Sequence, residues 1–108
     1  MNKYLKSLAL SLAAVLPLVR TTWYGARYQG RRTASGERFD SSALTGAHPS
    51  LPFGTRIRAS WLGRSVVIRI NDRMPSEGLD LSAAAFRVLA PWKIGVIHAE
   101  MEVINESR

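Results

Sequence analysis

VVIRINDRMP, residues 66–75, is a run of β-branched residues that ends abruptly at Asn71-Asp72. Branched side chains favour the pleated backbone of a strand, whereas Asn, Asp and Pro favour the turn that follows it. The sequence therefore predicts a strand whose end presents the carboxylate of Asp72 beside Arg73. Because a strand end is rigid on one side and open to a ligand on the other, Asp72 is the first candidate for a functional residue.

Further strands are predicted by alternating apolar and polar residues on both sides of this run. Residues 55–61 have the pattern of a half-buried strand, and the short Leu62-Gly63 turn predicts a hairpin with residues 65–70. Residues 21–25 and 95–104 are the predicted first and last strands. Short strands leave exposed edges unless the sheet closes, so the predicted architecture is a small closed β-barrel.

Two short helical segments are expected between these strands. Ser82 is a suitable N-cap for residues 83–89, where a run of alanines favours a helix. Residues 40–44 are expected to form one helical turn capped by Asp40. Asp80 precedes the predicted helix of residues 83–89. The favoured interpretation is that Asp80 has a structural role at the start of that helix.

Residues 1–19 resemble an export signal. Lys3 and Lys6 precede an apolar stretch, residues 7–19, which is too short to cross a bilayer as an ordinary helix but suits a signal-peptide core. An N-terminal anchor or a first buried helix is the alternative. The barrel domain would then occupy residues 20–108 of an exported protein of the periplasm or cell envelope. The sequence contains no Cys, so a lipoprotein is not expected.

The formal net charge of the 108-residue chain is +7, from 15 Lys and Arg against 8 Asp and Glu. Such a balance favours a polyanionic partner: nucleic acid, anionic lipid or an acidic wall polymer. No nucleic-acid partner is expected, because the basic residues are mostly single and no RNA-binding signature accompanies them. We expect no metal site and no other cofactor, because the sequence has no Cys and His48 is far from His98 in the chain.

Two carboxylates occupy positions that suit catalysis. Glu37 follows the glycine turn Ser35-Gly36, and Asp72 follows a strand. Cleavage of a glycosidic bond usually needs a general acid at the leaving oxygen and a second group at the oxocarbenium-like centre. The pair meets that need, although from spacing alone a solvated loop carboxylate remains the alternative for Glu37.

Seven segments of the chain, spread over residues 21–104, occur in the order found in one bacterial family. They are WYG (23–25), GRRTASGERFD (30–40), ALTGAH (43–48), LPFGT (51–55), GRSVV (63–67), RINDR (69–73) and LDLSAAA (79–85). In these segments the chain resembles the RlpA-like family of septal lytic transglycosylases. The resemblance implies a mainly β fold: a six-stranded double-psi β-barrel with one or two short helices.

The activity that the resemblance implies is cleavage of the MurNAc–GlcNAc bond of peptidoglycan without water. The C6 hydroxyl of the muramic acid attacks its own C1 and leaves a 1,6-anhydro end. The family needs the acids of its Ser-Gly-Glu and Asn-Asp-Arg motifs, which correspond here to Glu37 and Asp72. Asp72 would be the general acid/base at the scissile oxygen, and Glu37 would stabilise the developing positive charge or share the proton transfer.

The same resemblance implies a set of substrate-binding residues around the acids. Tyr24 and His48 would line the groove and hydrogen-bond the sugar, and Arg73 would orient Asp72 or meet a wall carboxylate. The full expected set is Tyr24, Ser35, Gly36, His48, Asn71 and Arg73. Peptidoglycan glycan strands are the implied substrate, division-site proteins are possible partners, and a monomer is the expected state.

The alternative is a catalytically silent barrel that binds peptidoglycan or another polysaccharide, as in expansin-like relatives. Silent barrels commonly lack one acid, so the presence of both Glu37 and Asp72 favours the enzyme. The chain departs from the family pattern just after Asp72, where Met74-Pro75-Ser76 stands in place of Gly-Pro-Phe and the loop is shorter.

Overall fold

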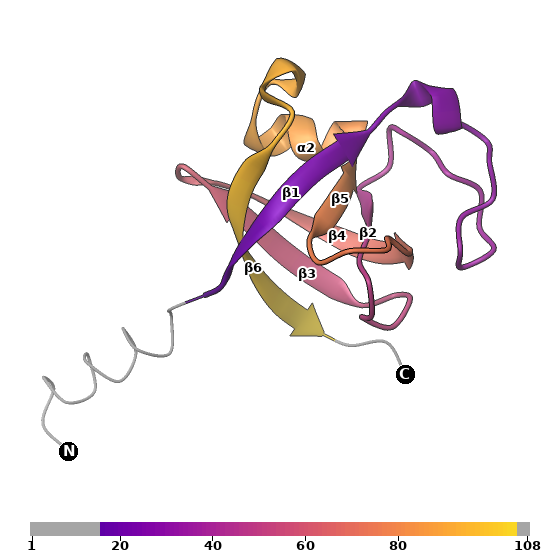
Figure 1. The fold of residues 1–108 in the computed structure, drawn as a ribbon, viewed down its shortest axis with the longest axis horizontal. Helices are drawn as coiled ribbons and strands as arrows, with labels where there is room; N and C mark the ends of the chain where they lie inside the picture. Colours follow the sequence, from indigo (N-terminus) through magenta and orange to yellow (C-terminus); the bar gives the residue numbers. More distant parts are fainter. Residues whose placement is uncertain (1–15, 106–108) are drawn as a thin grey trace, which may run out of the picture.

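Six strands close into a barrel in the order β1-β5-β2-β4-β3-β6 in the computed structural model, which describes residues 16–105 (Figure 1). The strands are β1 (Leu18–Tyr24), β2 (Thr45–Ala47), β3 (Arg56–Trp61), β4 (Arg64–Asp72), β5 (Leu79–Ser82) and β6 (Ile97–Asn105). The helical elements of the described residues are α2 (Ala83–Leu89) and two 3-10 turns, η1 (Ala26–Tyr28) and η2 (Trp92–Ile94). The predicted mainly β, six-stranded barrel is confirmed.

Two parallel pairs, β1 with β5 and β2 with β4, distinguish this barrel from a simple meander. The other neighbours are antiparallel, including the predicted β3–β4 hairpin. A long connection, residues 25–44, leads from β1 to β2 and projects from the barrel in Figure 1. This segment, called the β1–β2 loop below, forms one side of the candidate site.

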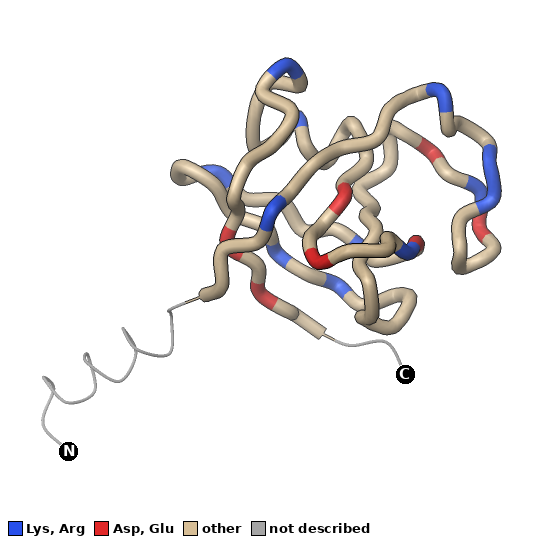
Figure 2. Tube along the Cα trace, in the orientation of Figure 1, with Lys and Arg blue, Asp and Glu red and all other residues tan. Residues whose placement is uncertain are grey.

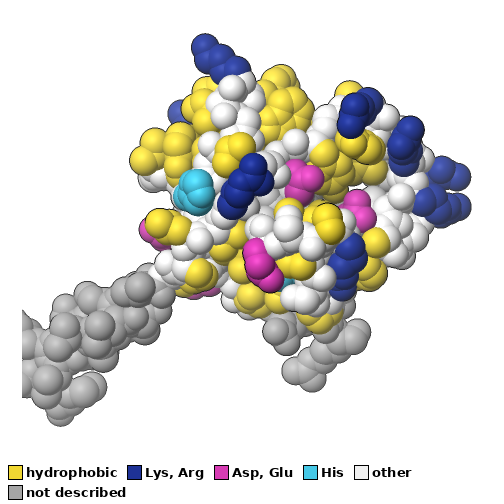
Figure 3. Space-filling model, viewed as in Figure 1, with side chains coloured by type: hydrophobic (Ala, Val, Ile, Leu, Met, Phe, Trp, Pro, Cys, Tyr) yellow, Lys and Arg dark blue, Asp and Glu magenta, His cyan; other side chains and the backbone are white. Residues whose placement is uncertain are grey.

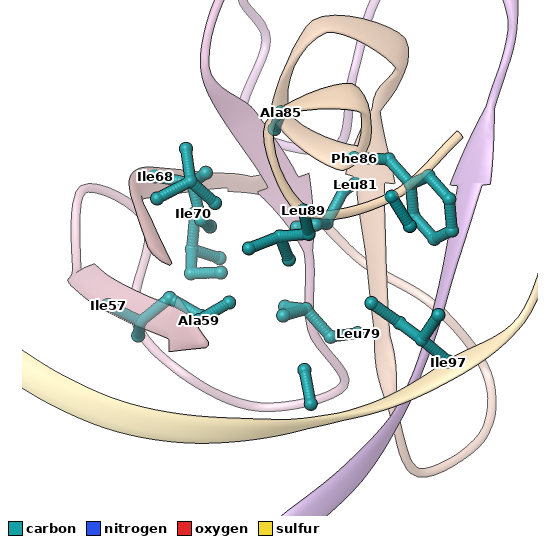
Figure 4. Packing of buried hydrophobic residues seen from close by; sticks show 13 residues of the cluster. Ile57, Ala59, Ile68, Ile70, Leu79, Leu81, Ala85, Phe86, Leu89 and Ile97 are labelled. Carbon is teal, nitrogen blue, oxygen red and sulfur yellow. The ribbon is translucent and has the colours of Figure 1, made fainter. Parts of the chain in front are cut away.

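The inward faces of the strands and one face of α2 form a single apolar core. Figure 4 shows Phe86 and Leu89 of α2 packed with Ile68, Ile70 and side chains of other strands. The side chains of these four residues are at most 1% exposed. Burying a side chain of this size contributes about 1.5–3 kcal/mol, so α2 is part of the core that keeps the barrel closed.

β1 begins earlier than the sequence pattern predicted. Leu18 and Val19, which the sequence analysis placed in the leader, pair with Glu100 and Ala99 of β6. The hydrogen bonding of β6 therefore extends β1 backwards into the apolar stretch. Residues 1–15 of the predicted leader lie outside the described residues. Between residues 16 and 105, no helix is long and apolar enough to cross a membrane.

Residues 40–44 do not form the expected helical turn. The carboxylate of Asp40 accepts hydrogen bonds from the backbone N–H and the hydroxyl of Ser42, at 3.0 and 2.7 Å. Such local bonds offer the backbone an alternative to a helix. The segment is an irregular turn, and it leads into β2, a strand too short to show alternation in the sequence.

Ser82 caps α2 as predicted and also ties the helix to the chain before β2. Its hydroxyl accepts a hydrogen bond from Ala85 N–H at 3.3 Å and donates one to the carbonyl of Ala43 at 2.5 Å. The residue is fully buried.

We expect Ser82→Ala to lower the free energy of unfolding by about 1–3 kcal/mol, because the variant loses the cap and leaves a partly buried carbonyl without its donor. Urea unfolding measures the change as a lower midpoint with an unchanged slope. Ser50→Ala, at an exposed position, is the matched control. A Ser82→Ala midpoint equal to that of the control would contradict this role.

Candidate active site

A row of laterally paired residues crosses four strands of the barrel wall. In the strand order β4, β2, β5 and β1 they are Asp72, Ala47, Asp80 and Thr22. Residues paired across adjacent strands present their side chains on the same face. Because strands lie about 4.8 Å apart, the backbones of Asp72 and Asp80 are about 10 Å apart, and only the methyl group of Ala47 stands between them.

Three residues of this row form the floor of a pocket of about 360 Å³ between the barrel and the β1–β2 loop. Asp72, Ala47 and Asp80 line it, and Tyr24 and Phe39 form an aromatic side. Figure 3 shows acidic side chains near this hollow and basic side chains on the loop beyond it. The pocket is in the size range of small-ligand sites, so the fold brings two carboxylates into one pocket of that size.

Asp72 is the last residue of β4, and its carboxylate is fixed by backbone groups. Oδ1 accepts hydrogen bonds from the N–H groups of Ala34 and Arg73, both at 2.9 Å. Oδ2 accepts none from the described residues, which leaves it available to a ligand. The guanidinium of Arg73 lies 4.0 Å from the ring centroid of Phe53. The backbone of Arg73, rather than its side-chain charge, therefore orients Asp72.

Glu37 lies within the β1–β2 loop and is held as a carboxylate. It forms a bidentate pair with Arg69 of β4, at 2.7 and 3.0 Å, and accepts a hydrogen bond from Asn71 Nδ2 at 2.7 Å. The Arg69 hydrogen bond first, and the Asn71 bond with it, hold the pKa of Glu37 below its usual value. Glu37 is not among the residues that line the pocket. Its contacts anchor the loop whose Ala34 N–H reaches Asp72.

The Glu37–Arg69 pair predicts an acid-dependent loss of stability. The folded pKa of Glu37 lies below the ordinary 4.5, so the stabilisation is complete above that pH and is lost as the pH falls through the folded pKa. The effect is modest, because the Arg69 and Glu37 side chains are 45% and 40% exposed. We expect Glu37→Gln to unfold at lower urea than wild type at neutral pH, with a smaller gap in acid. Glu102→Gln, which breaks the exposed Arg58 pair, is the control, and a gap that does not depend on pH would contradict the prediction.

His48 follows Ala47, the residue of β2 that pairs with Asp72. It does not line the pocket. Its backbone N–H donates to the carbonyl of Asp72 at 3.2 Å. Its Nδ1 accepts from the N–H groups of Ser50 and Leu51 at 3.1 and 3.0 Å. Burial is the first cause that lowers the pKa of His48. A neutral ring with Nδ1 as acceptor carries its proton on Nε2, so this side chain shapes the loop after β2.

Three other residues of the expected binding set build the loop and its attachment to β4. The hydroxyl of Ser35 is hydrogen-bonded to that of Thr33 at 2.8 Å. Gly36 has φ +95°, and its carbonyl accepts from Arg32 Nη1 at 2.7 Å. Asn71 is 1% exposed. The structure places all three outside the pocket lining.

Tyr24 and Arg73 are the members of the expected binding set that line the pocket. The Tyr24 ring stacks on Phe39, with centroids 4.5 Å apart. Its hydroxyl is buried and has no hydrogen-bond partner among the described residues. Burial, followed by the negative charges of Asp72 and Asp80, raises the pKa of Tyr24. The phenol therefore stays protonated, and its hydroxyl is a donor without a partner among the described residues.

Asp80 is the site residue that the sequence analysis missed. It does not serve the helix entry, because Ser82 caps α2. Its Oδ1 accepts a hydrogen bond from Thr22 Oγ1 at 2.8 Å. The signal in the sequence was the position of Asp80 between Leu79 and Leu81, both fully buried: an acid between two inward residues of a central strand faces the opposite side.

The β1–β2 loop carries several basic residues (Figure 2). Arg31 and Arg32 of the loop line the pocket. The guanidinium of Arg31 lies 5.7 Å from the ring centroid of Tyr28, and that of Arg27 lies 4.9 Å from it. Residues 16–105 contain no group of three or more His, Cys, Asp or Glu that could hold a metal ion. The arrangement suits acid–base chemistry on a polar or anionic ligand.

Fold and site together define a small double-psi β-barrel with a carboxylate-lined pocket. The sequence profile of the lytic transglycolase family matches residues 18–101, and the chain belongs to that family. It is 49% identical over 89 residues to a probable endolytic peptidoglycan transglycosylase RlpA of Synechocystis sp., and 41% identical over 88 residues to an endolytic peptidoglycan transglycosylase RlpA of Neisseria meningitidis. These alignments cover 78% and 77% of this chain but 28% and 37% of the relatives.

Solved structures with the same fold include proteins of other kinds. The Streptomyces papain inhibitor aligns with a TM-score of 0.67 and 27% identity, over 82% of this chain and 92% of its own. An expansin of Clavibacter michiganensis aligns with a TM-score of 0.71 and 21% identity, over 87% of this chain and 52% of its own. At this level of identity the expansin likeness shows the fold alone.

Proposed function

We propose that this chain is a catalytic barrel that cleaves peptidoglycan glycan strands as an endolytic lytic transglycosylase, leaving 1,6-anhydroMurNAc ends. The observation that carries the proposal is the Asp72 carboxylate, fixed by two backbone N–H groups at the floor of a pocket that fits part of a sugar chain. The relatives that carry this activity in their names share the barrel region.

In the proposed reaction, Asp72 is the general acid/base at the scissile bond. The C1–O bond to the next sugar breaks while the C6 hydroxyl of the same MurNAc forms a new bond to C1, so no water is consumed. A proton must reach the leaving oxygen and another must leave the C6 hydroxyl. The Tyr24 phenol, which has no partner in the described chain, would donate a hydrogen bond to the sugar.

Glu37 supports this reaction as a positioning residue in our proposal. Its pairing with Arg69 and Asn71 anchors the β1–β2 loop, which brings Ala34 N–H to Asp72. Its negative charge also favours a positive centre developing nearby. Loss of Glu37 would therefore lower turnover, and restoring the loop by another contact would partly restore it.

The setting follows from the substrate. Peptidoglycan lies outside the cytoplasmic membrane, so we propose that the part of the predicted leader that precedes β1 directs export, by a cleaved signal or an anchor, to the periplasm or envelope. The chain would act there as a monomer, with division-site proteins as candidate partners. The arginines of the β1–β2 loop would hold anionic groups of the wall beside the pocket.

Digestion of purified sacculi by the full chain tests the proposal. Soluble products with anhydro ends, detected by mass spectrometry, are the expected result. The non-catalytic alternative is favoured by one observation: Glu37 is already locked in an ion pair. If the chain pellets with sacculi and releases nothing, the barrel is a wall-binding module and the enzyme proposal is wrong.

A further inference from the structure

Asp80 and Asp72 lie in one pocket but in different surroundings. Asp72 ends β4 and receives two backbone N–H groups on one oxygen. Asp80 lies within β5, between the neighbouring strands β1 and β2. It is half-buried, and the hydrogen bond it accepts comes from the hydroxyl of Thr22. These different surroundings suit one carboxyl group to donating a proton and the other to accepting one.

The groups that face Asp80 come from three strands. On β1, Thr22 contacts its carboxylate, and Arg20 and Tyr24 lie two residues before and after Thr22. On β4, Asp72 faces it across Ala47 of β2. Burial is the first cause that raises the pKa of Asp80, and the charge of Asp72 adds to it. The Thr22 bond and Arg20 oppose them. Burial and a neighbouring negative charge favour the protonated form of Asp80, which is the form that a general acid needs.

We infer that Asp80 is a catalytic residue: it donates the proton to the leaving glycosidic oxygen, and Asp72 accepts the proton of the attacking C6 hydroxyl. This inference rests on the proposed function. In one turnover the C1–O bond breaks and the C1–O6 bond forms. One proton passes from Asp80 to the leaving oxygen, and one passes from the C6 hydroxyl to Asp72. Exchange with solvent then restores both acids, so atoms and charge balance without another reactant.

The geometry also explains the small residue between the acids. Ala47 lies on β2, the strand between β4 with Asp72 and β5 with Asp80. All three residues line the pocket. A gap of about two strand spacings, left open by a methyl group, gives room for the reacting ring between donor and acceptor. Tyr24, on the same face of β1 as Thr22, would contact that ring.

Two variants test the inference on the full chain. We expect Asp80→Asn to lower kcat for anhydro-product formation by at least about 100-fold, with sacculus binding and folding retained. Thr22→Val keeps the shape of the side chain and removes the hydrogen bond that stabilises the Asp80 carboxylate. We therefore expect it to move the alkaline limb of the pH–rate profile to higher pH. Asp40→Asn, which removes an exposed acid of the β1–β2 loop, should leave the rate and the profile at their wild-type values.

The inference is overturned if Asp80→Asn turns over like wild type, or if Thr22→Val leaves the profile in place. Should Asp80→Asn fail to fold, the Thr22→Val profile decides alone. Should the wild type release no anhydro product, the proposed function has failed. Carbon-13 NMR titration of the Asp80 carboxyl then tests the Asp72–Asp80 acid pair separately from the proposed function. Titration above the ordinary Asp range, moved to lower pH by Asp72→Asn, would keep the acid pair. An ordinary titration that Asp72→Asn does not change would remove it.

Discussion

Asp72→Asn is expected to abolish release of anhydro products from sacculi, with a loss of about 100- to 10,000-fold in kcat. Asparagine keeps an oxygen that can accept the N–H groups of Ala34 and Arg73, so the β4 end and the pocket remain in place. Only the ability to hold or take a proton is removed. The rate is measured as soluble anhydro-muropeptide formed over time.

The control for this variant is Glu100→Gln, which removes an exposed acid from β6 and should turn over like wild type. Sacculus pelleting and the urea midpoint of Asp72→Asn should also match wild type, since neither reports on proton transfer. If Asp72→Asn kept wild-type turnover, Asp72 would have no catalytic role, whatever the other acids do.

Phe86→Ala is expected to lower the free energy of unfolding by about 3–5 kcal/mol, the largest stability effect we predict. Phe86 lies on the inner face of α2, is fully buried, and packs 6.4 Å from the Trp23 ring of β1. Truncation leaves a cavity between α2 and the barrel (Figure 4). For a domain whose total stability is typically about 5–15 kcal/mol, that is a large fraction.

Urea unfolding monitored by tryptophan fluorescence measures the Phe86→Ala change. Val88→Ala, on the same helix but 40% exposed, is the matched control. Apart from the small gain in helix propensity from Val to Ala, its free energy of unfolding should differ from wild type by less than about 0.5 kcal/mol. Equal midpoints for the two variants would show that α2 does not close the core.

The fold was predictable because its periodicity is local. Ile57 and Ala59 of β3, and Ile68 and Ile70 of β4, alternate with polar residues in the sequence and are buried in the structure. The helix after Ser82 was equally visible from its cap and its alanines. β2 was not predicted, because three residues carry no alternation. The start of β1 was misplaced, because its pairing with β6 is a long-range property.

The site was predictable only in part, for a related reason. Asp72 was found because its strand ends visibly, and Tyr24 because the family resemblance points to it. The Glu37–Arg69 pair joins residues 32 positions apart, and no local pattern announces it. Asp80 was assigned to the helix because the sequence does not reveal that β5 pairs with β1 and β2. Once that pairing is known, the row from Asp72 to Thr22 follows from strand register alone.

The most direct test of the account is digestion of sacculi by the full chain in oxygen-18 water, with the new glycan ends examined by mass spectrometry. We predict anhydro ends that carry no label, because the C6 hydroxyl of the substrate itself attacks C1. Labelled, hydrated reducing ends would show that water is the nucleophile and would contradict a transglycosylase on this barrel.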